Sequence, residues 1–109
     1  MAKRTDANQS EIVKTFRSLG ASVQIISDIG KGCPDLVVGL FGLNFLIEVK
    51  DGKKIPSARK LTEHELTFFD TWKGQVCVLK SVDEVVDFVK KVHDIEYGSW
   101  KKNRPESIW

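Results

Sequence analysis

Residues 32–50 read GCPDLVVGLFGLNFLIEVK, two apolar runs separated by a short break at Phe41-Gly42. Each run has the length of a β-strand, and a break of two residues is typical of a tight hairpin turn. Apolar side chains fall on both alternating positions of each run, which favours strands covered on both faces. We therefore predict a hairpin of strands 35–40 and 43–50 in an α/β sandwich rather than an open sheet.

The turn decides which residues of this hairpin face each other. If Phe41-Gly42 is a two-residue turn, Asp35 lies opposite Glu48. Directly opposed residues have Cα atoms about 4.5–5.5 Å apart and point to the same face. Alternation along the strand adds Lys50 to that face. A bulge at Gly39 or a longer turn would shift this register by one residue.

The expected pair of opposed carboxylates needs positive charge nearby, because like charges face to face destabilise a strand pair. A divalent cation with oxygen ligands would supply it, and magnesium is usually held by one or two carboxylates together with water. The Lys50 ammonium alone is a second solution. Two structural explanations also stay open: Glu48-Val49-Lys50 as a strand emerging into solvent, and Pro34-Asp35 as a turn whose carboxylate caps its own backbone.

The segment before the hairpin predicts a helix and a strand. Apolar residues at helical spacing indicate a first helix, capped by Thr5 or Asp6 and ended by Gly20. Branched apolar residues over 21–27 favour a strand, and the glycines that bracket a lysine make 28–32 a loop.

The segment after the hairpin predicts two helices around one strand. A hydroxyl residue followed three positions later by glutamate starts each helix, at Thr62 with Glu65 and at Ser81 with Glu84. The apolar run 76–79 between them reads as a short buried strand. The expected order of elements is therefore α, β, β, β, α, β, α.

Length and composition indicate one soluble domain. The chain has 109 residues and a net charge of +2, an excess too small to indicate a nucleic-acid partner by itself. We expect a single domain over 1–109, with its core at about 6–93 and a tail at 94–109 that no pattern assigns. The chain has neither an apolar stretch of membrane-spanning length nor a secretory signal at its start, so we expect a cytoplasmic protein with no membrane partner. Cys33 and Cys77 lack zinc-site spacing and read as buried, reduced thiols.

The residues of the hairpin resemble those of a known nuclease superfamily. Pro34-Asp35, followed thirteen positions after Asp35 by Glu48-Val49-Lys50, resembles the PD-(D/E)XK nuclease signature. The flanking sequence is similar to its VRR-NUC (virus-type replication-repair nuclease) branch, in the segments Gly32-Cys33-Pro34-Asp35-Leu36, Leu46-Ile47-Glu48-Val49-Lys50 and Leu61-Thr62. Short stand-alone members of this branch occur in phages, and the domain also forms the nuclease end of the Fanconi-associated nuclease.

The resemblance implies a restriction-endonuclease-like fold and a set of catalytic residues. The fold is a central mixed four-stranded sheet flanked by helices. Asp35 and Glu48 would be metal ligands, with the Val49 carbonyl as a third, and Lys50 would orient or polarise the attacking water. Glu11, on the first helix, matches the accessory acidic residue of the family, although a surface glutamate on a helix is an equally good explanation.

Two further features bear on the implied site. Glu65 stands where the branch often has glutamine, so its part in the site is open and the capping box is a sufficient explanation for it. Residues 51–60 form a glycine-rich and basic segment, typical of a surface loop. Its Lys53, Lys54, Arg59 and Lys60 could follow a DNA backbone, and a solvated basic loop is the alternative.

The implied function is that of a Mg²⁺-dependent deoxyribonuclease, with Mn²⁺ able to substitute and no organic cofactor. The resemblance also implies branched or otherwise structured DNA as the substrate, such as a Holliday junction, and a homodimer as the active form. A phage-encoded protein of this kind would act in the cytoplasm of its host. Two alternatives remain: a non-catalytic nucleic-acid-binding module that retains the fold, and a restriction-type endonuclease, for which we expect the chain to be too short to hold an added recognition domain.

Overall fold

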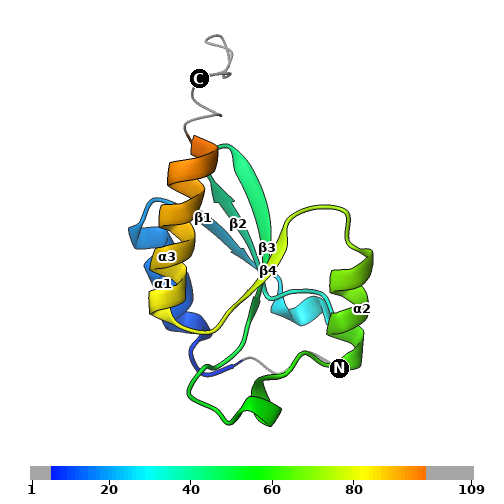
Figure 1. The fold of residues 1–109 in the computed structure, drawn as a ribbon. Helices are drawn as coiled ribbons and strands as arrows, with labels where there is room; N and C mark the ends of the chain where they lie inside the picture. Colours follow the sequence, from blue (N-terminus) through cyan, green and yellow to red (C-terminus); the bar gives the residue numbers. More distant parts are fainter. Residues whose placement is uncertain (1–5, 98–109) are drawn as a thin grey trace.

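The computed structural model describes residues 6–97 as a four-stranded sheet with helices on both sides (Figure 1). In chain order the elements are α1 (Gln9–Ser18), β1 (Ser22–Ile25), β2 (Leu36–Leu40), β3 (Leu43–Val49), α2 (Glu63–Thr71), β4 (Val76–Leu79) and α3 (Val82–Val92). Short 3-10 turns lie at Ser27–Ile29 and Pro56–Arg59, and a π-helical turn, His93–Tyr97, follows α3. The predicted order α, β, β, β, α, β, α is confirmed. Most of the predicted tail, residues 98–109, lies outside the described residues.

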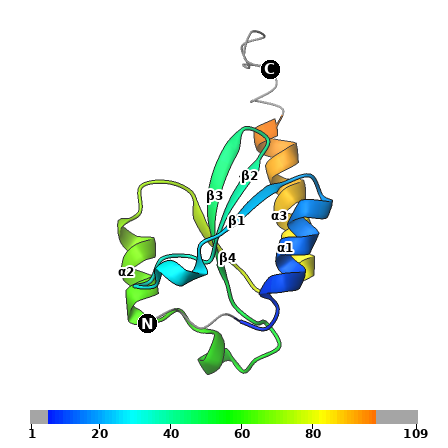
Figure 2. The same ribbon diagram turned by 180° about the vertical axis from the view of Figure 1, so that it is seen from behind.

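The sheet is mixed, as expected. Its strand order is β1-β2-β3-β4, with β1–β2 and β2–β3 antiparallel and β3–β4 parallel. Parallel neighbours need a long crossover connection, which is usually helical. Here the connection contains α2, which lies on the side of the sheet away from α1 and α3 (Figure 2).

The register of the β2–β3 hairpin agrees with the two-residue turn. Leu40 pairs with Leu43 and Leu36 pairs with Ile47, without a bulge between them. Phe41 and Gly42 both have positive φ, 51° and 82°, as a type I′ hairpin turn requires.

The hydrophobic core lies between the sheet and the pair α1 and α3. Residues of β2 alternate between buried and half-buried, so one face of the strand points into this core. The ring of Phe88 on α3 meets Phe16 of α1 and Phe45 of β3 edge to face, with centroids 6.1 and 5.0 Å apart. Burial of each large apolar side chain contributes roughly 1.5–3 kcal/mol. Helix α2 covers the opposite face of the sheet. This cover is less complete than the predicted sandwich requires, because the buried residue of α2 is a single one, Glu65.

Two boundaries near the amino terminus differ from the predictions. Helix α1 begins at Gln9 without a side-chain cap, and Asp6 pairs with Lys54 (3.0 Å) instead of capping it. The other predicted cap, Thr5, lies outside the described residues. Strand β1 ends at Ile25 because Ile26 turns out of the extended conformation (φ −125°, ψ 22°) into the 3-10 turn.

The two later helices begin where the capping boxes predict. In α2 the box is complete: Thr62 Oγ1 accepts the Glu65 N–H (3.2 Å) and Glu65 Oε1 accepts the Thr62 N–H (2.8 Å). In α3 the Ser81 hydroxyl accepts the Glu84 N–H (3.2 Å), but Glu84 Oε1 accepts the N–H of Lys80 (2.9 Å). The second box is therefore confirmed only in its serine half.

Candidate active site

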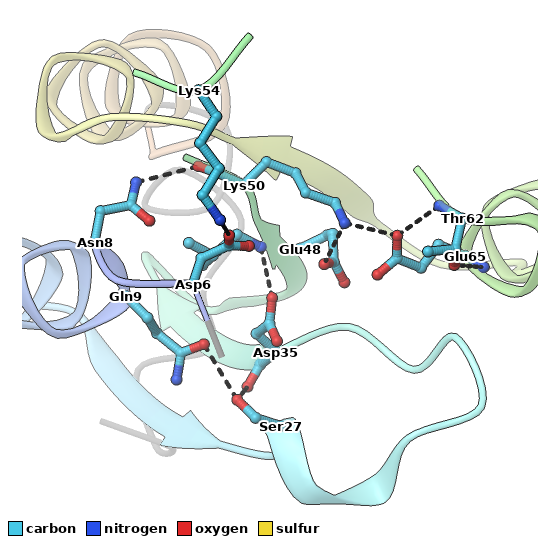
Figure 3. A network of polar contacts seen from close by, with 11 residues as sticks. Asp6, Asn8, Gln9, Ser27, Asp35, Glu48, Lys50, Lys54, Thr62 and Glu65 are labelled. Carbon is cyan, nitrogen blue, oxygen red and sulfur yellow. Dashed lines mark hydrogen bonds and ion pairs between the residues drawn. The ribbon is translucent and has the colours of Figure 1, made fainter. Parts of the chain in front are cut away.

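Asp35, Glu48 and Lys50 lie together on the face of the sheet that points toward α2 (Figure 3). Asp35 immediately precedes β2, Glu48 belongs to β3, and Lys50 immediately follows β3. The exposed fraction of the surface is 2 % for Asp35, 0 % for Glu48 and 9 % for Lys50. Buried ionisable groups are retained only where partners or a function compensate their desolvation, so this cluster is the first candidate for a site.

The Asp35 carboxylate is held by the neighbouring strand. Its Oδ2 accepts the backbone N–H of Val49 at 2.7 Å, and the Asp35 N–H donates to the Ile47 carbonyl at 3.0 Å. The carboxylate thus forms a hydrogen bond across the hairpin. The alternative prediction, a Pro34-Asp35 turn, has the carboxylate cap its own backbone segment instead. Ser27 Oγ, which lies 3.2 Å from Gln9 Oε1 and 3.5 Å from the Asp35 carbonyl, links this segment to α1.

Lys50 is fixed at both its backbone and its ammonium group. Its N–H donates to the Leu79 carbonyl (3.1 Å), and its own carbonyl accepts the Asn8 Nδ2 amide (3.1 Å). Lys50 Nζ lies 2.8 Å from Glu65 Oε1 and 3.7 Å from Glu48 Oε2. Lys50 therefore shares the face of Glu48, as alternation predicts, and its ammonium lies between two carboxyl groups.

Glu65 joins the cluster from α2 while it also caps that helix. It is 3 % exposed, and its Oε1 lies within hydrogen-bond distance of both Lys50 Nζ and the Thr62 N–H. Burial raises the pKa of this carboxyl, but its hydrogen bonds with Lys50, Thr62 and Glu48 outweigh burial and lower the pKa to about 2. Glu65 is thus ionised at neutral pH, and the capping and site interpretations of this residue are compatible.

Gly32 brings α2 to the cluster, which sequence reasoning missed. Its φ is +80°, and a Cβ at this position would lie 2.3 Å from the His64 carbonyl oxygen and 2.9 Å from the Glu65 nitrogen. Only a residue without a side chain permits so close an approach. The signal in the sequence is the glycine two positions before Pro34, although nothing local identifies its partner.

Glu11 does not join the buried cluster. It is exposed on α1 and lines a shallow pocket together with Asn8, Asp51 and Lys53. The amino-terminal end of α1 instead contributes Gln9 and the preceding N-cap residue Asn8, which no motif indicates. The role of Glu11 therefore stays a prediction.

The basic loop contains exposed lysines and one structural arginine. Lys53, Lys54 and Lys60 are exposed, and Lys54 also pairs with Asp6. Arg59 is half-buried, and its Nη1 donates to the Gly52 carbonyl at 2.8 Å, which closes the loop. Contact of these residues with DNA stays a prediction, and the one interaction that Arg59 shows here is with the loop itself.

The oxygen donors of the cluster fit a hard divalent cation. Asp35 and Glu48 offer two carboxylates, the number that Mg²⁺ commonly takes from a protein. Among residues 6–97 there is no group of three or more His, Cys, Asp or Glu placed to hold a metal ion, so Glu65 does not complete a three-carboxylate cage. The Val49 carbonyl remains the predicted third ligand, and the Val49 N–H orients Asp35 beside it.

Comparisons of the chain with protein-family models, curated proteins and solved structures find no match. Within the described part of the chain, the helices are too short or too polar to cross a bilayer.

Proposed function

We propose that this protein is a metal-dependent nuclease that hydrolyses DNA phosphodiester bonds, with a restriction-endonuclease-like core of the VRR-NUC type. The observation that carries the proposal is the buried meeting of Asp35, Glu48 and Lys50 at one end of the β2–β3 hairpin. Burial of two carboxyl groups and a lysine costs desolvation free energy on folding. The same three groups are useful in phosphoryl chemistry, which makes a functional role the better explanation for keeping them. The resemblance in sequence and the order and mixed pairing of the strands support the same conclusion.

The chain's own residues divide the chemistry among them. Asp35 and Glu48 would hold Mg²⁺ or Mn²⁺, and the Val49 N–H keeps Asp35 oriented for this task. A bound divalent cation supplies Lewis-acid stabilisation of the charge on the phosphate. The Lys50 ammonium carries positive charge and N–H donors, so it orients the attacking water and stabilises negative charge that develops on the phosphate.

Branched DNA and a homodimer are the proposed substrate and active form, and both come from the resemblance. The exposed Lys53 and Lys60 support contact with a phosphate backbone next to the site. One compact domain with one site makes one cut at a time. Symmetric cleavage of a junction would therefore need two copies related by a two-fold axis.

Cleavage of a DNA panel tests the proposal. Purified protein is incubated with single-stranded, duplex, flap and four-way-junction DNA in Mg²⁺, Mn²⁺ or EDTA, and its solution mass is measured alongside. We expect cleavage in either metal and none in EDTA, and loss of cleavage in Asp35→Asn, Glu48→Gln and Lys50→Gln proteins that remain folded. Glu84→Gln, which alters a capping glutamate of α3, is the matched control and should cut normally. Full activity in Asp35→Asn or Lys50→Gln protein would refute the assignment.

A non-catalytic nucleic-acid-binding module is the second candidate. It is favoured by one observation: Lys50 already places positive charge between Glu48 and Glu65, so the cluster has a compensating cation of its own. This candidate predicts DNA binding that persists in EDTA, with no product at any Mg²⁺ or Mn²⁺ concentration.

A further inference from the structure

The Lys50 ammonium lies much closer to one of its two carboxyl neighbours than to the other. Its distance to Glu65 Oε1 is 2.8 Å, the length of a charge-assisted hydrogen bond, whereas its distance to Glu48 Oε2 is 3.7 Å. We propose that Glu65 is a positioning residue that holds the Lys50 ammonium off Glu48, so that a divalent cation binds Glu48 and Asp35 without competition from the lysine. This inference rests on the proposed nuclease function.

Glu65 is suited to this role because its own position is fixed. The Thr62 N–H donates to the same Oε1 that meets Lys50, and the Thr62 hydroxyl accepts the Glu65 N–H. The close approach of Gly32 fixes the backbone of this turn against the segment that leads to Asp35. Glu65 is also the buried residue of α2, so the helix presents this one carboxylate to the site.

The Lys50 ammonium and a metal ion compete for the same carboxylate oxygens. Both are cations that bind carboxylate oxygens, and Lys50 Nζ is already within ion-pair distance of Glu48. A neutral amide at position 65 would still accept a hydrogen bond from Lys50, but it would lack the Coulomb attraction between two opposite charges, so it would hold the ammonium less firmly. The ammonium would then move toward Glu48 and occupy the place of the metal.

Metal binding by a Glu65→Gln variant tests the proposal. Glutamine serves a capping box as well as glutamate does, so the variant keeps the helix cap and loses only the charge. Mn²⁺ binding to metal-free protein is measured by calorimetry, with circular dichroism as the check on folding. We expect Glu65→Gln to bind Mn²⁺ about tenfold to a hundredfold more weakly, the usual effect of altering a partner of a metal ligand. Glu84→Gln removes the charge of the corresponding residue of α3 and should bind like the wild type.

A double-mutant cycle with Lys50→Gln separates positioning from a direct effect on the metal. If Glu65 acts through the lysine, Glu65→Gln should leave the Mn²⁺ affinity nearly unchanged when Lys50 is already glutamine. An equal loss of affinity in both backgrounds would mean that Glu65 acts on the cation directly or on Glu48 through their hydrogen bond, and would overturn the positioning role.

The outcomes also separate this inference from the proposed function. Wild-type protein that binds Mn²⁺ and cuts DNA, with a Glu65→Gln variant of equal Mn²⁺ affinity, would overturn the positioning role and leave the nuclease standing. Wild-type protein that binds no Mn²⁺ would overturn both.

Discussion

Replacement of Gly32 by alanine should separate α2 from the rest of the site. The left-handed φ of +80° is strained for any residue with a Cβ, at about 1–2 kcal/mol. The new Cβ would lie 2.3 Å from the His64 carbonyl oxygen, where ordinary contact begins at 3.4 Å, so the two backbones must move apart by about 1 Å. The same movement would stretch the 2.8 Å contact between Lys50 and Glu65 beyond hydrogen-bond length.

Gly20→Ala is the matched control for this substitution. Its φ is also left-handed, at +91°, but a Cβ there meets nothing within 4 Å. In urea unfolding, we expect Gly32→Ala to lose about 1–3 kcal/mol more than Gly20→Ala, the usual penalty of overpacking. DNA cleavage should fall by about 100-fold in Gly32→Ala alone, because a misplacement of 1 Å has that effect on a positioned reaction. Equal unfolding free energies together with equal cleavage rates would refute this explanation of the glycine.

Three further predictions follow from the charges and the thiols. Lys53→Ala and Lys60→Ala should each lower the slope of log affinity for DNA against log salt by about one, as measured by fluorescence anisotropy, and an unchanged slope would place these lysines away from the phosphates. Because the pKa of Glu65 is about 2 in the folded protein and its ordinary value is 4.5, the unfolded chain takes up the proton first, and folding stability should fall as the pH drops from about 4.5 toward 2. In EDTA, the urea midpoint of Glu65→Gln should change less over that range, and an equal change would exclude this carboxyl as the cause. Cys33 and Cys77 are half-buried, where the sequence predicts buried thiols. Partial burial raises the pKa of the Cys77 thiol to about 11, so in a Cys33→Ser variant at pH 8 it should react with iodoacetamide far more slowly than in urea, and equal rates would contradict this protection.

The hairpin was predictable because its signals are local. A two-residue turn and alternation along the strands determine the register, and the register determines that Asp35, Glu48 and Lys50 share a face. Phe41 is an uncommon residue for a turn that needs positive φ, but the apolar runs on either side leave little freedom in the length of the turn.

Features that depend on distant partners were not predictable. Asp6 reads as a helix cap in the sequence, yet Lys54, far along the chain, takes its carboxylate. Glu65 has a complete local explanation in its capping box, and nothing in the sequence shows that the crossover also carries it to Lys50. Gly32 reads only as part of a loop until its neighbour on α2 is known.

The weak attachment of α2 determines which part of the protein unfolds first. Most of this helix faces outward, with Leu66 and the C-cap residue Trp72 about half exposed, and Glu65 is its buried residue. Segments with few buried contacts open locally at much lower free energy than the core to which they are attached. The amide hydrogens of α2 should therefore exchange with solvent well before those of β2 and β3. On warming, the protein would lose the carboxylate that holds Lys50 while its sheet, α1 and α3 stay folded.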